Sequence, residues 1–227
     1  MTGPWSVPPL WAGETVFCIA SGSSLRRMNL ARLRGRRVIV VNDNYLRCPW
    51  ADLLYFCDHK WWVWHTTKPA FRGQFAAFEG LKVTLDRRVH DADPGIRWLA
   101  DGGWNEGQGL VGLDERPTHL RNGRNSGYQA LHLAVHLGAK RIVLLGYDMK
   151  TGPNGEGHWF GEHVDETGQE RKTTPATIQR WAAHFETLVE PLAARGIEVL
   201  NATPGSAIAC FPRTSLADCL EPDPAAV

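Results

Sequence analysis

Short apolar runs, most of them ending in small or polar residues, dominate the hydrophobic pattern of the chain. They predict buried strands at residues 15–20, 37–41, 53–56, 81–85, 141–145 and 197–200. Aliphatic and β-branched residues follow one another within most of these runs, with little polar alternation. Because strands that are covered on both faces lack the alternation of half-exposed strands, the pattern favours a parallel sheet.

Apolar residues at helical spacing occupy three segments between the strands. One follows the first strand as far as Leu33, and the others cover residues 126–137 and 177–194. Ser126 is expected to cap the second helix, and Pro191 to kink the last turn of the third. Strands and helices that alternate with short connections predict an α/β fold: a doubly wound, mostly parallel Rossmann-like sheet with helices on both faces.

The second predicted helix carries a polar stripe of Gln129, His132 and His136. Two histidines four residues apart on a helix suit a metal ion. A stripe that faces solvent is the commoner arrangement in an amphipathic helix, so we expect this stripe to be solvated.

The stretch from residue 61 to residue 122 has weaker periodicity and many glycines. We expect an irregular, lid-like insertion there, within a single Rossmann-like nucleotide-binding domain of residues 1–220. A frayed tail is expected at residues 221–227. A cluster of tryptophans begins at Trp61. Such side chains line ligand clefts or pack in a core, and both interpretations stay open.

Composition narrows the class of protein. A hydrophobic content of 43% supports a real core, and a formal net charge of +1 gives no general attraction to nucleic acid or to an anionic membrane. The five cysteines form no C-x-x-C pair, which favours a reducing compartment. No apolar run is long enough to span a bilayer, and the first residues do not read as a signal peptide. We therefore expect a cytoplasmic protein.

Small or polar residues follow the predicted strands at the end where an open α/β sheet binds ligands. The turn after the first strand matches neither G-x-G-x-x-G nor the P-loop pattern, but its backbone N–H groups suit an anion. Any one of these polar ends is explained as a turn former, whereas together they predict a nucleotide site. The residues of this site are Ser21, Gly22, Ser24, Asn42, Asp58, Asn125, Ser126, Gly146 and Asp148.

Two histidines, His158 and His163, follow the strand that ends at Gly146. One of them would act as general base on an acceptor hydroxyl, since histidine titrates near neutral pH. With Asp148 and Glu162 they would alternatively hold a divalent cation. In a third interpretation they are loop residues without a chemical role. All three stay open, with the general base first.

Several short motifs occur in the order found in a known superfamily. They are Ser21-Gly-Ser-Ser-Leu25, Asn42, Asp58, Ser126-Gly127 before a helix, and Ile142-Val-Leu-Leu-Gly-Tyr-Asp148. This arrangement resembles that of bacterial sialyltransferases that use CMP-activated sugars. It is similar also to the related archaeal 6-hydroxymethylpterin diphosphokinase-like proteins and to uncharacterised phage-encoded relatives. The resemblance covers most of the chain except the middle stretch.

The resemblance implies that Ser21, Gly22 and Ser24 lie on the phosphate side of a bound nucleotide. Asn42, Asp58, Asn125 and Ser126 would surround the nucleoside and the phosphate, and Gly146 and Asp148 would line the nucleoside pocket. The chain departs from the family in Ser23, where proline is common. In the sialyltransferases the histidine base precedes the last long helix, whereas the two histidines of this chain lie nearer the strand before it.

The predicted function is that of a nucleotide-dependent transferase of the glycosyltransferase type. It would move a group from a nucleotide-activated donor to an acceptor hydroxyl, with a histidine as base. It would bind a nucleotide or nucleotide sugar and an acceptor, and the reaction would require no metal ion. A homo-oligomer is compatible with this function. The alternatives are a diphosphokinase that uses ATP and Mg²⁺ on a hydroxymethyl heterocycle, and a non-catalytic nucleotide-binding protein associated with phage.

Overall fold

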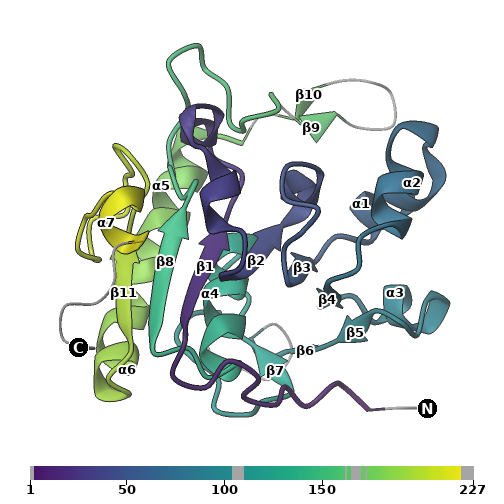
Figure 1. Cartoon of the computed structure of the whole chain (residues 1–227), viewed down its shortest axis with the longest axis horizontal. Helices are drawn as coiled ribbons and strands as arrows, with labels where there is room; N and C mark the ends of the chain where they lie inside the picture. The colour runs from purple at the N-terminus through teal and green to yellow at the C-terminus, as the bar shows by residue number, and fades with distance from the viewer. Residues whose placement is uncertain (1–2, 104–109, 162, 165–169, 172, 221–227) are drawn as a thin grey trace.

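The computed structural model describes residues 3–103, 110–161, 163–164, 170–171 and 173–220. At its centre is a sheet of seven strands in the order β11-β8-β1-β2-β3-β4-β5, and every neighbouring pair is parallel (Figure 1). The strands are β1 Thr15–Ile19, β2 Arg37–Val41, β3 Leu53–Phe56, β4 Leu81–Thr84, β5 Arg97–Trp98, β8 Arg141–Leu145 and β11 Glu198–Asn201. Helices cover both faces of the sheet, which confirms the predicted doubly wound α/β fold.

The direction of winding changes once in the sheet. From β1 the chain moves outward through β2, β3 and β4 to β5 at one edge. It then returns to place β8 on the other side of β1, with β11 beyond it. The carboxyl ends of β1 and β8 therefore diverge into loops that run to opposite sides, and this is where open α/β sheets bind ligands.

Alternate residues of each strand enter two separate hydrophobic cores. Val16 and Cys18 of β1 lie in the core that also holds Leu131 of helix α4 (Ser126–His136). Phe17 and Ile19, which point to the opposite face, lie in the second core. Because both faces are covered, the strands show the continuous apolar runs from which they were predicted.

The predicted helix after β1 is replaced by two short 3-10 helices, η1 (Ser23–Arg27) and η2 (Leu30–Leu33). The apolar positions were predicted correctly, because Leu25, Leu30 and Leu33 are all buried in the second core. Spacing of three residues fits a 3-10 turn as well as an α-helix, so the pattern did not distinguish them.

The long helix expected at residues 177–194 is divided into α5 (Pro175–His184), η4 (Phe185–Leu188) and α6 (Val189–Ala194). Pro191 explains the division. Its nitrogen carries no proton for the carbonyl four residues earlier, at Thr187, and its ring crowds that carbonyl. The 3-10 segment contains Thr187, so the distortion lies one turn before the proline.

The stretch from residue 61 to residue 122 is more regular than the sequence predicted. It contains most of α1 (His59–Thr67), α2 (Pro69–Ala76), β4, α3 (Arg87–Ala92), β5 and the short parallel pair β6 (Ala100–Asp101) and β7 (His119–Leu120). Figure 1 shows α1, α2 and α3 beside the β4–β5 edge of the sheet. This stretch extends the main sheet, and its helices cover that edge.

The tryptophans of α1 pack mainly in the second core. The ring of Trp61 stacks on His65 at 3.9 Å and lies 4.8 Å from the ring of Phe56. Apolar residues occur on several sides of α1, since Trp61 and Trp62 pack against the second core whereas Val63 is exposed. A helix that is apolar on several sides gives little periodic signal, which explains why the sequence did not predict it.

Helix α4 corrects two expectations. Its cap is Asn125, whose side chain accepts a hydrogen bond of 3.1 Å from the backbone N–H of Tyr128, while Ser126 is the first helical residue. The polar stripe is largely buried, since Gln129 and His132 have almost no exposed surface. Asparagine and serine are nearly equal as caps, so the sequence did not separate these neighbours.

The buried stripe satisfies the backbone of the segment that covers it. Nδ1 of His132 accepts from the N–H of Arg121 at 3.0 Å, and Nε2 lies 3.2 Å from the carbonyl oxygen of Asp114. Nε2 also lies 3.1 Å from the backbone nitrogen of Asp114, and it cannot both accept there and donate to the carbonyl. Because Nδ1 accepts from Arg121, a neutral imidazole carries its proton on Nε2, which fits the contact with the carbonyl. Gln129 likewise donates to the carbonyl of Asn122 at 2.6 Å. Gln129 and His132 are buried because the backbone groups of the segment that packs on α4 need hydrogen-bond partners there.

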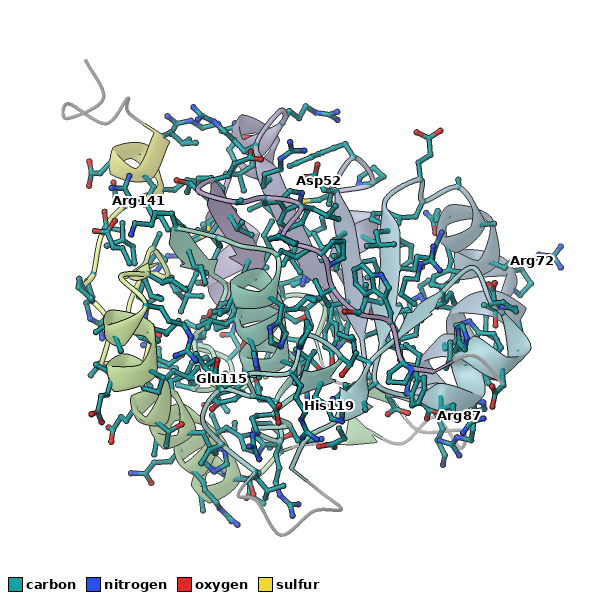
Figure 2. The ribbon with its side chains drawn as sticks, turned by 90° about the horizontal axis from the view of Figure 1, so that it is seen from below. Asp52, Arg72, Arg87, Glu115, His119 and Arg141 are labelled. Carbon is teal, nitrogen blue, oxygen red and sulfur yellow. The ribbon has the colours of Figure 1, made fainter. Side chains whose placement is uncertain are left out.

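Charged side chains join neighbouring strands at their amino ends, the side from which Figure 2 is viewed. Asp52 accepts a hydrogen bond of 2.8 Å from the N–H of Val38 and one of 3.4 Å from Arg37. Arg141 forms an ion pair with Glu198 across β8 and β11. Exposed pairs of this kind contribute about 0–1 kcal/mol.

The remaining elements are the antiparallel pair β9 (His163–Val164) and β10 (Glu170–Arg171), the 3-10 helix η3 (Asn42–Leu46) and α7 (Leu216–Leu220). Among the described residues, no helix is both long enough and apolar enough to cross a membrane.

The burial of His132 predicts a loss of stability in acid. Burial, together with the nearby His136, lowers the pKa of His132 to about 3. In the unfolded chain the imidazole titrates near pH ~6.5, so between these values only the unfolded state binds this proton. The free energy of unfolding should therefore fall as the pH drops through this window, by up to about 1.4 kcal/mol per pH unit.

Urea denaturation from about pH 8 to about pH 5 measures this dependence. The variant His132→Asn keeps an acceptor for the N–H of Arg121 but has no group that titrates. It should be less stable than the native protein at the upper pH and show a shallower decline. Equal slopes in the two proteins would contradict the assignment.

Candidate functional site

A cavity, called the first cavity below, lies at the carboxyl ends of β1, β2 and β8, where the winding of the sheet changes direction. Its volume is about 530 Å³. Most of the residues predicted for the nucleotide site line it: Ser21, Gly22, Asn42, Asn125, Ser126, Gly146 and Asp148, and the candidate base His158 lies there too. Segments far apart in the sequence therefore meet at one end of the sheet.

The other predicted residues lie elsewhere. Asp58 is exposed and caps α1, with its side chain accepting a hydrogen bond of 2.8 Å from the N–H of Lys60. Ser24 does not line the cavity and bonds instead to Asp148. His163 belongs to strand β9, and its side chain falls outside the described part of the structure.

Asp148 binds the turn that follows β1. One carboxylate oxygen accepts from the backbone N–H of Ser24 at 2.9 Å and lies 3.4 Å from the hydroxyl of Ser23. The other oxygen accepts from the hydroxyl of Ser24 at 2.7 Å. With 4% of its surface exposed, this carboxylate replaces water by hydrogen bonds from the protein. The N–H and hydroxyl of Ser24 are therefore engaged by the protein itself.

Gly22 makes this contact possible. A Cβ at this position would lie 1.9 Å from Oδ2 of Asp148 and 2.6 Å from the carbonyl oxygen of Gly146. The backbone N–H of Gly22 also donates to that carbonyl at 2.8 Å. Gly22, which the sequence suggested for phosphate binding, thus allows the turn after β1 to pack closely against the loop after β8.

Asn44, which the sequence did not single out, is buried and joins three segments beside the site. Its Nδ2 donates to the carbonyl of Val41 at 2.8 Å and lies 3.2 Å from the hydroxyl of Ser21. Its Oδ1 accepts from the indole N–H of Trp159 at 2.9 Å. In the run Asn42-Asp-Asn44 the sequence favoured the residue nearest the strand, whereas the 3-10 turn η3 directs Asn44 inward.

Three non-glycine residues of the described chain have a left-handed backbone: Asn42 (φ 51°), Arg124 (φ 53°) and Met149 (φ 48°). All three line this cavity. Asparagine adopts this conformation readily, but for arginine and methionine it is energetically unfavourable. Backbone strain of this kind concentrates at functional sites, so its gathering around one cavity makes this cavity the candidate ligand site.

The segment after β8 is held against the first turn by Trp159. Its backbone N–H donates to the carbonyl of Ser21 at 2.9 Å, and its carbonyl accepts from Arg26 at 2.7 Å. The guanidinium of Arg47 lies 5.1 Å from the centre of the indole. Figure 1 shows η1 and this segment at the same end of the sheet.

This anchoring fixes the position of the candidate base. His158 precedes Trp159 and lines the cavity, with its ring stacked on that of Phe160 at 5.0 Å. Because the neighbouring tryptophan is bound on several sides, His158 is part of a defined wall.

A second cavity of about 440 Å³ lies beside the first, at the carboxyl end of β3. The two share a wall formed by Arg124, Asn125, Ser126 and Trp181. Of the described residues of the stretch 61–122, none lines the first cavity and Asn122 alone lines the second. Trp181 of α5, outside the cluster at Trp61, is thus the tryptophan that lines both cavities.

Cys57 also lines the second cavity. Burial raises the pKa of its thiol, while a contact with the Ser126 hydroxyl at 3.4 Å acts in the opposite direction. The thiol is therefore protonated at neutral pH and is a poor nucleophile.

Charge is distributed unevenly around the first cavity. Arg124 and Lys150 line it and are exposed, whereas the carboxylate of Asp148 is bound to the serines of the first turn. Over the ranges that the structure describes, no three His, Cys, Asp or Glu side chains converge as metal ligands. Among the described residues of the cavity wall, the exposed charges are thus positive, which suits an anionic ligand.

The close contact at Gly22 gives a direct test. Gly22→Ala must separate the first turn from Asp148, and we expect it to lower the free energy of unfolding by roughly 2–4 kcal/mol. Gly73→Ala in α2 is the matched control, because a Cβ there meets nothing within 4 Å. That change should raise stability by about 0.5–1 kcal/mol. Chemical denaturation measures both, and an unaltered Gly22→Ala protein would contradict the proposed contact.

Comparison with the profiles of known protein families finds no match, and a search of curated proteins finds no similar sequence. The position of the cavity in the fold and the residues that line it are therefore the observations that bear on its function.

Proposed function

We propose that this protein is a nucleotide-dependent transferase of the glycosyltransferase type, with its nucleotide-activated donor bound in the first cavity. The observation that carries the proposal is the position of this cavity at the carboxyl ends of β1, β2 and β8, where the winding reverses. Doubly wound sheets bind nucleotides at this position. The resemblance of the strand-end motifs to those of CMP-sugar sialyltransferases supports the same choice.

The size and lining of the cavity support a nucleotide. Its volume of about 530 Å³ falls within the range of small-molecule sites, roughly 300–1,000 Å³. Met149, Ile178 and Trp181 provide apolar surface for a base, while Asn42 and Ser21 offer polar groups for a sugar. The wall thus combines the two kinds of surface that a nucleoside presents.

Positive charge on one side of the cavity suits the phosphates. Arg124 and Lys150 supply cationic side chains. The amino end of α4 adds the partial positive charge of a helix terminus through Ser126 and Gly127, which also line the cavity. These groups would stabilise the negative charge that develops on the leaving nucleotide.

His158 is the proposed general base. In the reaction, the acceptor oxygen forms a bond to the transferred carbon, and the bond from that carbon to the donor phosphate oxygen breaks. The imidazole of His158 takes the proton of the acceptor hydroxyl. The electron pair of the broken bond remains on the nucleotide phosphate, beside Arg124 and Lys150.

Nucleotide binding is the first test. Thermal unfolding with CMP, UDP, GDP and ATP, each with and without Mg²⁺, should show stabilisation by at least one of them. A ligand at about 100 times its Kd adds about 2.7 kcal/mol. A dependence on ATP and Mg²⁺ together would favour the diphosphokinase instead. The absence of any shift would remove the shared premise of a nucleotide site.

A pair of variants assigns the binding to the cavity. Ile178→Glu places a carboxylate in the lining and should abolish the thermal shift. Val189→Glu, at an exposed apolar position on α6, is the control and should leave it intact. A shift that persists in Ile178→Glu would place the nucleotide elsewhere.

His158→Ala tests the base once the donor is known. We expect turnover to fall by about 10²–10⁴-fold, with nucleotide affinity retained, because the side chain acts on the acceptor proton. His59→Ala is the matched control: His59 also lies beside an aromatic ring, that of Trp62 at 5.6 Å, but lines neither cavity. Unchanged turnover in His158→Ala would remove it as the base. Nucleotide binding without any turnover in the native protein would favour the non-catalytic alternative.

A further inference from the structure

The second cavity continues the first along the carboxyl edge of the sheet. The first occupies the ends of β8, β1 and β2, and the second begins at Cys57, directly after β3. The segment Asn125–Ser126 and the side chain of Trp181 belong to both linings. Two ligands, one in each cavity, would therefore meet at this shared wall.

Helix α5 contributes to both cavities through two neighbouring stripes. Thr174, at its cap, and Ile178, four residues later, line the first cavity. Thr177 and Arg180, three residues apart, line the second. Trp181 lies between the stripes and lines both. Residues three and four apart share a helix face, so the two cavities lie against neighbouring faces of α5.

The lining of the second cavity is cationic. Arg124 and Arg180 both line it, and among the described lining residues there is no Asp or Glu. Within the described part of the chain, no carboxylate forms an ion pair with Arg180, which is exposed on α5. The carboxylate of Asp101 accepts a hydrogen bond of 2.8 Å from the side chain of Asn122, which lines the cavity. Guanidinium groups bind carboxylates and phosphates through paired N–H donors.

The floor of this cavity is held in place by internal hydrogen bonds. Gln129 accepts from the hydroxyl of Tyr55 at 2.9 Å and donates to the carbonyl of Asn122 at 2.6 Å. Ser126 lies 3.4 Å from the protonated thiol of Cys57. The polar groups are thus positioned before a ligand arrives, which reduces the entropic cost of binding.

We propose that the second cavity is the acceptor subsite, and that it takes a hydroxylated molecule whose carboxylate or phosphate group lies between Arg124 and Arg180, beside Trp181. The acceptor role rests on the proposed function, whereas anion binding in this cavity does not. A donor in the first cavity and the hydroxyl of this acceptor would meet at the shared wall of Asn125, Ser126 and Trp181.

Small anions test the subsite without knowledge of the natural acceptor. The probes are glycerate, which carries a carboxylate, glycerol 3-phosphate, and neutral glycerol. NMR titration follows the indole N–H signal of Trp181, which is assigned by comparison with Trp181→Phe. At least one anionic probe should shift this signal with saturation, glycerol should not, and the two anions show which group is preferred.

Arg180→Ala should weaken binding of the preferred anion by about tenfold or more, since a hydrogen bond to a charged group is lost. Its affinity for the nucleotide should change less than about twofold, which is below 0.5 kcal/mol. Gln179→Ala, on the exposed side of α5 outside both cavities, is the matched control and should change neither.

Three results would overturn the proposal. They are equal binding of glycerol and the anions, anion binding that is unaltered in Arg180→Ala, and equal loss of nucleotide and anion affinity in that variant. The last would assign the second cavity to the donor phosphates. If the anions bind as expected but no nucleotide does, the anion site stands and the proposed transferase function falls.

Discussion

The buried carboxylate of Asp148 joins the two halves of the sheet at the point where its winding reverses. An unpaired charge in this position would be strongly unfavourable, and the serines of the first turn stabilise it through backbone and hydroxyl donors. The contact requires a residue without a side chain at Gly22. It also fixes the edge of the first cavity, because the turn that Asp148 holds carries Ser21 and Gly22 into the lining.

Other parts of the site depend on this junction. The turn held by Asp148 presents the carbonyl of Ser21, which binds Trp159, and the hydroxyl of Ser21, which contacts Asn44. Trp159 in turn binds Asn44 and places His158 in the cavity wall. A site assembled from three loops in this way is rigid where its contacts are buried. Two of the left-handed residues adjoin this network, since Asn42 begins the 3-10 turn of Asn44 and Met149 follows Asp148.

Much of the fold followed from local pattern. Continuous apolar runs located the long strands because both faces of the sheet are covered, and that covering is itself what removes the alternation. Helix α1 escaped prediction because it is apolar on several sides, and the buried polar stripe of α4 was placed in solvent. In both cases the deciding fact was a tertiary contact. Trp61 of α1 packs against Tyr45 of η3, and His132 bonds to Asp114 and Arg121 on either side of β7.

The sequence by itself determined which residues gather at the ligand-binding edge, since parallel strands bring their carboxyl ends together whatever the loops do. It did not determine what those residues bind. Asp148 and Ser24 engage each other, and Asp58 caps a helix. Asn44 bonds to Ser21 and Trp159 beside the site. Only the tertiary structure decided these roles, because a hydrogen-bonding side chain takes the nearest partner in space. The second cavity likewise depends on the tertiary structure, because its lining comes from α5, from the amino end of α4 and from Cys57 after β3.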